Sequence, residues 1–480
     1  MSGTMIALAG FAIMLVLIAA RAPIGLSMLL VGAAGYAHLA SGAALFAYMK
    51  TNPYHQFANY TLSVIPLFIL MGALAEKAGI AAALFKAAER ALGGFRGGLA
   101  MAVIGACTAF GAICGSSVAT TATFGRAALP ELLKARYDGG LATGTIAVGG
   151  TLGILIPPSV ILVVYAITTE QNIAKLFQAA LIPGLLAALF YCLTIAIVVR
   201  RNPELAPSPE TIVIEKVRQP LWPKWIAGLV LVVVSVLFLR GTIGWELSAV
   251  YLALATLLAF IDVAVMPALM IAVIVVGGIY GGVFTPTEGA AVGAIAMLVV
   301  GVGKGGLGWR DILEAIRQTA ETSGMIFIIL LGAEVFGAFL ALSHLPTTAA
   351  EMIGNSGLSP YLVLVAMLAF YILLGAVMDE LAMILLTLPV FFPVVQALDF
   401  GMPADDVAIW FGILVLIVVG IGLTAPPIGL NVFVISSLAP TVSITATYRG
   451  VLPFLIADVA RLLLVLAVPG LALWLVRLLA

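Results

Sequence analysis

Long runs of apolar residues, separated by short polar or charged stretches, cover almost the whole chain. A helix that crosses a bilayer needs about 20 mostly apolar residues, so the pattern predicts a protein made of membrane helices. The predicted helices span 5–20, 24–47, 61–76, 98–113, 121–133, 141–168, 175–199, 225–239, 246–262, 264–282, 286–303, 320–342, 361–377, 384–398, 407–438 and 451–479. Those at 98–113, 121–133, 361–377 and 384–398 are too short to cross.

The four short runs form two pairs, and each pair is predicted to be a re-entrant hairpin that enters the membrane halfway and returns. The first pair is joined by CGSSVAT and leaves through the basic stretch KARYDGG, whereas the second is joined by MDELA and leaves through the acidic stretch DFGMPADD. Cytoplasmic segments are enriched in Lys and Arg, so the first hairpin is expected on the cytoplasmic side and the second on the outer side. Counting crossings from the basic loop 200–224 places the N-terminus outside.

A proline pair interrupts the apolar run that follows each hairpin. The pairs lie in ILIPPSVI, residues 154–161, and in LTAPPIGL, residues 423–430. Proline has no backbone N–H and breaks a helix, so both runs are predicted to be broken helices. A hairpin followed by a broken helix thus occurs twice, once from each face, as an inverted repeat. Secondary transporters use such repeats to build a site near the bilayer midplane from discontinuous helices.

Composition excludes several other classes of protein. The chain is 63% hydrophobic and 9% charged with a net charge of zero, whereas soluble proteins carry about 25% charged residues. There is no basic footprint for nucleic acid, no metal-binding or disulfide spacing among the three Cys and three His, and no P-loop or nucleophile elbow. Energy for transport is therefore expected from an ion gradient. The first apolar run lacks a basic n-region and is expected to remain as a membrane helix.

Small and hydroxyl-bearing residues at the two tips and the two breaks are the candidate cation ligands, because open carbonyls and hydroxyls suit a hard cation such as Na⁺. At the first tip and break the candidates are Gly115, Ser116, Ser117, Gly150, Thr151, Gly153, Pro158 and Ser159. At the second they are Asp379, Gly422, Thr424, Ala425 and Asn431. Thr120, Thr151, Ser159 and Asn431 are the candidates for contact with a substrate.

Each of these assignments has a structural alternative. The glycines could serve close helix packing, and Asp379 could cap the second arm of its hairpin. Arg126 is expected to reach the cytoplasmic interface, and Glu334 could face a cavity or be a bonded interior acid. In FTPTEGAAVGA, Thr285 or Thr287 and Glu288 are interpreted as a helix start.

At these residues the chain resembles the large membrane subunit of the TRAP transporters, the tripartite ATP-independent periplasmic transporters of the DctM-like family. The motifs are CGSSVATTATFGRAALPELLKARYDGG, GTLGILIPPS, GGVFTPTEGAAVGA, the Asp379 hairpin with LPVFFP, and LTAPPIGLNVF. The resemblance implies an all-α polytopic membrane protein with an inverted-repeat, elevator-type fold in a bacterial inner membrane. It also implies sodium-coupled import of a small organic anion, with a carboxylate favoured, a small four-helix membrane subunit, and a periplasmic substrate-binding protein.

The resemblance also implies particular sodium ligands, mostly backbone carbonyls and hydroxyls. For the first ion they fall on Cys114, Ser117, Gly153, Ile156 and Pro158, and for the second near Gly375, Gly422, Ala425 and Ile428. This chain has Cys114 where the family commonly has Ser, and Ala425 where Thr is common. Without the Thr hydroxyl, the second site is either weaker or relies on the carbonyl alone.

The expected organisation alternates scaffold and transport units. The divisions are 1–97 (scaffold and cytoplasmic arm), 98–174 (first repeat), 175–342 (scaffold), 343–440 (second repeat) and 441–480 (C-terminal helix). Residues 225–262 are expected to form a helical pair that the family usually lacks. No block of four helices precedes residue 61 or follows 450, so the small subunit is expected to be a separate chain. The main alternative function is an ion or small-solute channel built on re-entrant loops; a membrane enzyme would need a nucleophile or metal set.

Overall fold

The structure is a computed structural model and describes residues 2–207, 265–354 and 357–479. The predicted helical pair at 225–262 lies outside the described residues. Throughout the described part, every regular element is a helix. The chain is thus an all-α protein, and seven of its described helices are long and apolar enough to cross a membrane, or eight if the bent pair at the first break counts as one span.

The N-terminal region differs from the prediction in one respect. The run at 24–47 was expected to be one helix, but α2 (Ile24–Leu39) ends early and α3 (Gly42–Phe57) begins after Ser41. The prediction was wrong because Ser41 caps a new helix, its Oγ accepting a hydrogen bond from the Ala44 N–H at 3.1 Å. Hydrophobicity alone does not reveal such a cap.

The first predicted repeat is present as a hairpin followed by a broken helix. A long arm packs beside it, formed by η1 (Tyr60–Ser63), α4 (Val64–Lys77) and α5 (Ile80–Leu92). The repeat itself consists of α6 (Gly98–Cys114), α7 (Ser117–Ala127), α8 (Leu129–Lys134), α9 (Gly139–Leu155) and α10 (Val160–Thr168). The axes of α9 and α10 differ in direction by 44°, so the run that contains the first proline pair is interrupted as predicted.

The second repeat follows the same order. Its elements are α18 (Pro360–Gly375), α19 (Glu380–Ala397), α20 (Ala404–Gly422) and α21 (Leu430–Leu438). A helix that the hydrophobic pattern did not predict, α17 (Leu345–Gly354), precedes it. The Pro157–Pro158 and Pro426–Pro427 peptide bonds are both cis.

The remaining helices surround the two repeats. They are α1 (Gly3–Ala19), α11 (Ile173–Arg201), η2 (Pro203–Leu205), α14 (Met266–Tyr280), α15 (Pro286–Gly303), α16 (Trp309–Leu342), α22 (Ile444–Ala467) and α23 (Gly470–Leu478). The prediction of a single C-terminal helix at 451–479 was wrong, because this region forms two helices, α22 and α23. Ser443 caps α22 earlier, through the Ala446 N–H at 3.2 Å, and the helix stops before Pro469.

One smaller structural prediction, the helix start at Thr285, is confirmed, and Arg126 has a partner that the sequence did not predict. Thr285 and Glu288 form a capping box at the start of α15, with the Thr285 N–H donating to the Glu288 carboxylate at 2.8 Å and the Glu288 N–H to Thr285 Oγ1 at 3.3 Å. Arg126 keeps its guanidinium half-exposed and also forms an ion pair with Glu76 at the end of α4. Both groups of residues therefore have structural roles.

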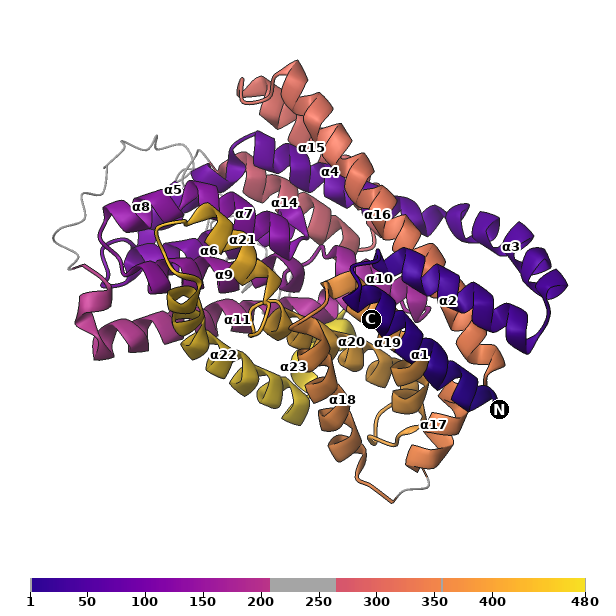
Figure 1. Ribbon diagram of the computed structural model, residues 1–480. Helices are drawn as coiled ribbons and strands as arrows, with labels where there is room; N and C mark the ends of the chain where they lie inside the picture. The colour runs from indigo at the N-terminus through magenta and orange to yellow at the C-terminus, as the bar shows by residue number, and fades with distance from the viewer. Residues whose placement is uncertain (1, 208–264, 355–356, 480) are drawn as a thin grey trace, which may run out of the picture.

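The two repeats exchange their half-helices. The second half of the second broken helix, α21, packs against α7 and α9 of the first repeat, while α10 packs against α19 and α20 of the second. Figure 1 shows α21 beside α7 of the first repeat. Each break is thus completed by the other repeat, and the two proline regions lie within one packed unit.

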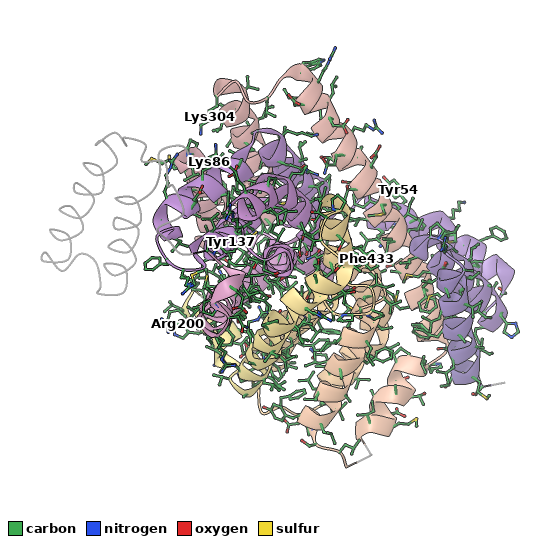
Figure 2. The ribbon with its side chains drawn as sticks, turned by 60° about the vertical axis from the view of Figure 1, so that its left-hand side comes forward. Tyr54, Lys86, Tyr137, Arg200, Lys304 and Phe433 are labelled. Atoms are coloured by element: carbon green, nitrogen blue, oxygen red, sulfur yellow. The ribbon has the colours of Figure 1, made fainter. Side chains whose placement is uncertain are left out.

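Basic residues gather on one side of the molecule. Figure 2 shows Lys86, Arg200 and Lys304 on the same side, whereas Tyr54 of α3 lies on the opposite side. These residues lie in or beside the segments that the charge rule assigns to the cytoplasm.

Candidate functional site

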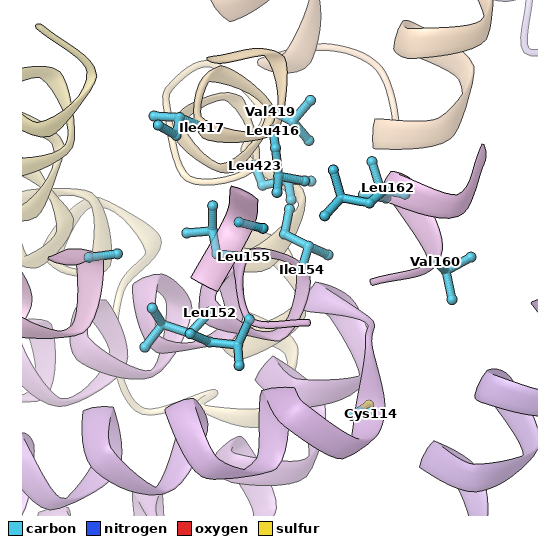
Figure 3. Packing of buried hydrophobic residues seen from close by; sticks show 14 of the residues in the cluster. Cys114, Leu152, Ile154, Leu155, Val160, Leu162, Leu416, Ile417, Val419 and Leu423 are labelled. Carbon is cyan, nitrogen blue, oxygen red and sulfur yellow. The ribbon is translucent and has the colours of Figure 1, made fainter. Parts of the chain in front are cut away.

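The tip of the first hairpin touches the backbone of the first break. A Cβ built on Gly153 would lie 2.5 Å from the Ser116 carbonyl oxygen, and one on Gly115 would lie 2.8 Å from the Pro158 carbonyl oxygen. Contacts this short leave room for glycine alone. Figure 3 shows the hairpin end at Cys114 below the interruption between Leu155 and Val160. The structure therefore brings together the predicted residues of the first tip and the first break.

Hydroxyl groups at this tip are partly used within the hairpin. Ser116 caps α7, because its Oγ accepts from the Ala119 N–H at 3.4 Å. Thr120 Oγ1 donates to the Ser116 carbonyl at 2.7 Å, and the Cys114 Sγ lies 4.0 Å from the same oxygen. The Ser116 carbonyl also accepts from the Thr120 N–H at 3.2 Å. A carbonyl has two lone pairs, so this oxygen is already satisfied within the hairpin.

Asn431, at the start of α21, joins the second break to the first hairpin. Its Nδ2 donates to Ser117 Oγ at 2.7 Å and to the Ala147 carbonyl at 3.0 Å. Both side chains, those of Ser117 and Asn431, are fully buried. This contact brings the N-termini of α7 and α21 to the same place, although the two residues are 314 positions apart in sequence.

Two buried oxygen atoms beside this contact have no hydrogen-bond partner among the described residues. They are Asn431 Oδ1 and Thr121 Oγ1. Both residues border Gly150, since a Cβ built there would lie 1.8 Å from Thr121 Oγ1 and 3.1 Å from Asn431 Nδ2. A buried polar atom without a partner is costly, so these oxygens are candidates to contact a ligand. Sequence reasoning did not select Thr121, because nothing in the run of threonines distinguishes it.

Two of the predicted substrate contacts have structural partners instead. Thr151 Oγ1 donates to the Val148 carbonyl at 2.7 Å and lies 3.1 Å from the Tyr191 hydroxyl. Ser159 caps α10 by accepting from the Leu162 N–H at 3.4 Å. Of the four substrate candidates, Asn431 alone retains a side-chain oxygen that lacks a partner among the described residues.

The second tip and break are in contact in a similar way. A Cβ built on Gly422 would lie 2.7 Å from the Gly375 Cα, and the Ile428 N–H donates to the Ala376 carbonyl at 3.2 Å. The Thr424 hydroxyl is directed to its own helix, 3.1 Å from the Ile421 carbonyl. The second tip and break thus meet at Gly375, Gly422 and Ile428, just as the first tip and break meet in the first repeat. The Thr424 hydroxyl is used in bonding back to the end of α20.

Asp379 caps the second arm of the second hairpin. Its Oδ1 accepts from the Leu381 and Ala382 N–H groups at 3.0 and 3.1 Å, which is the geometry of an N-cap. The neighbouring Glu380 has a buried Oε2 without a hydrogen-bond partner among the described residues. The capping interpretation of Asp379 thus has direct geometric support, and a role toward a cation would be added to it.

A buried ion pair extends from the first break into the surrounding helices. Asp458 and Arg461 of α22 pair at 2.7 Å with side chains that are 1% and 0% exposed. The Tyr191 hydroxyl lies 2.9 Å from both Asp458 carboxylate oxygens and also contacts Thr151 of α9. The position of α9, which carries Gly150 and Gly153, is thereby linked to a charged pair inside the protein.

The oxygen atoms at the two tips are of the kind that a hard cation accepts. Among the described residues, no group of three or more His, Cys, Asp or Glu side chains could hold a metal ion. The atoms gathered at the first tip are instead carbonyls and hydroxyls, which are the donors preferred by cations such as Na⁺. The residues present therefore fit sodium better than a transition metal.

Comparison with known proteins gives the family. Residues 11–471 match the family model of the "Tripartite ATP-independent periplasmic transporter, DctM component". The C4-dicarboxylate TRAP transporter large permease protein DctM of Pseudomonas aeruginosa is 33% identical over 423 residues, covering 86% of each chain. The sialic acid TRAP transporter large permease protein SiaM of Vibrio cholerae is 28% identical, covering 86% of this chain and 85% of that protein.

Among solved structures, the YdaH transporter of Alcanivorax borkumensis has a similar fold. The two superpose with a TM-score of 0.57 over 90% of each chain, at 14% sequence identity. The matching relatives are permease proteins of transporters, not enzymes. The helical hairpins, the broken helices and the match over nearly the whole length agree, and the chain belongs to the DctM family of large membrane components of tripartite ATP-independent periplasmic transporters.

Proposed function

We propose that this protein is the large permease subunit of a sodium-coupled importer of a small organic anion, with a carboxylate as the favoured substrate class. It works with a separate small membrane subunit and a periplasmic substrate-binding protein in a bacterial inner membrane, with its N-terminus on the periplasmic side. The relatives named for C4-dicarboxylate and sialic acid support a carboxylate, and the relative named for isethionate, which is a sulfonate, supports the broader class of small organic anions. The ectoine permease of Halomonas elongata, 28% identical, widens the range to a zwitterion that carries a carboxylate.

The observation that carries this proposal is the hydrogen bond between Asn431 and Ser117. It joins the two repeats at a point where the N-termini of α7 and α21 converge. Helix N-termini carry partial positive charge and favour an anionic group. Beside them, the Pro158 carbonyl, which lies against Gly115 at the hairpin tip, would offer an oxygen ligand to a cation. An anion and its coupling ion would thus bind side by side and stabilise each other.

Transport would follow by movement of the unit that contains both repeats. The two breaks are completed by helices of the opposite repeat, so the ion and substrate positions would move together as a rigid body against the surrounding helices. The exchange of α10 and α21 between the repeats supports this elevator movement. A channel would instead require a continuous pore.

The test is uptake into proteoliposomes that contain this chain with its small subunit, supplied with the binding protein and labelled substrate. We expect uptake to require an inward sodium gradient and to be absent when potassium replaces sodium. Equal uptake with and without the sodium gradient would refute the coupling, and single-channel currents in planar bilayers would favour a channel.

Ser117→Ala gives the residue-level test. The substitution removes the acceptor of the Asn431 bond. Because a hydrogen bond of about 1.4 kcal/mol corresponds to about a ten-fold change, we expect sodium-driven uptake to fall about ten-fold while the protein remains folded. The matched control is Ser437→Ala on α21, the helix that carries Asn431. The exposed Ser437 hydroxyl donates to the Val434 carbonyl of its own helix and has no other partner among the described residues. Full activity of Ser117→Ala would remove this residue from the site.

A further inference from the structure

A groove lies between the last turns of α11 and the first turns of α22, on another face of these helices than the buried pair described above. Its volume is about 530 Å³. Its walls include Ile197, Val198, Leu452, Pro453, Ile456 and Ala457. The Ile197, Leu452 and Ile456 side chains are 52%, 57% and 68% exposed. In a membrane helix, such apolar side chains face lipid, so this groove opens toward the bilayer.

Helical periodicity lines up the groove residues with two arginines. On α11, the groove residues Ile197, Val198 and Arg201 lie three, four and seven positions after Thr194, which places them on one face of the helix. On α22 the corresponding face begins with Arg449 and continues through Leu452 and Ile456. The two apolar stripes therefore face each other, and Arg201 and Arg449 lie together at the same end of the groove.

The charge of this end is not neutralised within the described part of the chain. Arg201 and Arg449 are both exposed, and no ion pair between either arginine and a described carboxylate is present. α11 is apolar over most of its length and carries Arg200 and Arg201 in its last turn. Figure 2 shows Arg200 at this end of the helix, on the basic side of the molecule. The end of the groove thus combines two free guanidinium groups with the edge of an apolar segment.

We propose that this groove binds an anionic glycerophospholipid of the cytoplasmic leaflet. The phosphate would lie between Arg201 and Arg449, and the acyl chains would lie along the apolar walls. Guanidinium groups bind phosphate oxygens through charge-assisted hydrogen bonds, and basic pockets between membrane helices on the cytoplasmic side bind anionic headgroups. A free phosphate or nucleotide would not use the apolar walls, whereas a phospholipid uses both parts of the groove.

The headgroup charge is what the site should discriminate. Each basic residue near an anionic headgroup contributes a roughly five-fold preference, so two arginines predict about thirty-fold tighter binding of phosphatidylglycerol than of phosphatidylcholine. Cardiolipin, with two phosphates, is expected to bind at least as tightly as phosphatidylglycerol. The bound lipid would hold α11 and α22 together at their cytoplasmic ends.

The experiment measures binding of dioctanoyl phosphatidylglycerol and dioctanoyl phosphatidylcholine to the purified full-length chain in detergent, by native mass spectrometry and by titration. Arg201→Gln/Arg449→Gln is expected to lose about thirty-fold in affinity for phosphatidylglycerol and to bind the two lipids equally. Arg200→Gln is the matched control, because Arg200 neighbours Arg201 but does not line the groove; it should bind phosphatidylglycerol as the unmodified chain does.

A second variant tests the walls independently of the charges. Ala457→Phe fills the groove and leaves both arginines in place, and we expect it to weaken phosphatidylglycerol binding with no change in thermal unfolding of the lipid-free protein. Equal binding of the two lipids by the unmodified chain would overturn the proposal. Phosphatidylglycerol binding that is retained by the double arginine variant would also overturn it. Loss of the bound lipid when the chain is purified with its small membrane subunit would overturn it as well, because it would assign the groove to a protein partner.

Discussion

The buried pair of Asp458 and Arg461 allows a quantitative test of how the first break is held in place. Asp458 accepts from Arg461 at 2.7 Å and from the Tyr191 hydroxyl at 2.9 Å. If Asp458 is changed to Asn, the Arg461 guanidinium keeps its charge in a site that is 0% exposed. If Arg461 is changed to Met, the carboxylate keeps its charge and loses its partner.

The expected loss of stability follows from the hydrogen bonds that remain to the unpaired charge. Without Asp458, the guanidinium retains one long hydrogen bond, from NH1 to the Pro183 carbonyl at 3.4 Å, and its Nε has no partner among the described residues. Breaking a buried ion pair by removing one partner costs about 3–5 kcal/mol, whereas replacing both partners is often neutral. We therefore expect about 3–5 kcal/mol for each single variant and no more than about 1 kcal/mol for Asp458→Asn/Arg461→Met.

The measurement is a double-mutant cycle of reversible unfolding in mixed detergent micelles, with uptake in proteoliposomes as a second readout. The pair reaches Thr151 through Tyr191, so each single variant is also expected to raise the sodium concentration needed for half-maximal uptake. The double variant should recover stability more fully than sodium affinity. Single variants that cost less than about 1 kcal/mol, or a double variant whose cost equals their sum, would refute the reasoning.

Two further predictions concern the hairpins. Gly153→Ala would place a Cβ 2.5 Å from the Ser116 carbonyl oxygen, and we expect it to cost about 1–3 kcal/mol of stability through overpacking and to abolish most sodium-driven uptake. Gly420→Ala is the control and should be tolerated, because the nearest neighbour of its Cβ would lie at 3.6 Å. Equal uptake by both variants would contradict the close contact of tip and break. Asn caps a helix about as well as Asp, so Asp379→Asn should remain as stable as the parent yet lose sodium affinity. Asp379→Ala should in addition lose about 1 kcal/mol of stability. Unchanged uptake by Asp379→Asn would leave this residue with a capping role alone.

The hydrophobic pattern was sufficient for the order of the elements but not for all of their ends. The short runs and the proline pairs predicted two hairpins and two broken helices, and these helix pairs are present at α6–α7, α9–α10, α18–α19 and α20–α21. The run at 384–398 was predicted to be too short to cross, but α19 begins at Glu380, after the Asp379 cap, and is long enough to cross. The division of 24–47 and the early start of α22 were missed, because single serine caps decide them. Such a cap changes the local hydrogen bonding without changing the hydrophobicity of the run.

What the sequence by itself determined was the membrane class, the duplicated unit and the small, oxygen-bearing residues at each tip, since these depend on composition and local backbone chemistry. The tertiary structure alone decided that Asn431 bonds Ser117, that Thr121 lies beside Gly150, and that Thr151 is connected to Asp458 through Tyr191. These contacts join positions far apart in sequence, and they form because each broken helix is completed by packing against the opposite repeat. No local pattern encodes that exchange, because it depends on how the whole set of helices buries its surfaces together.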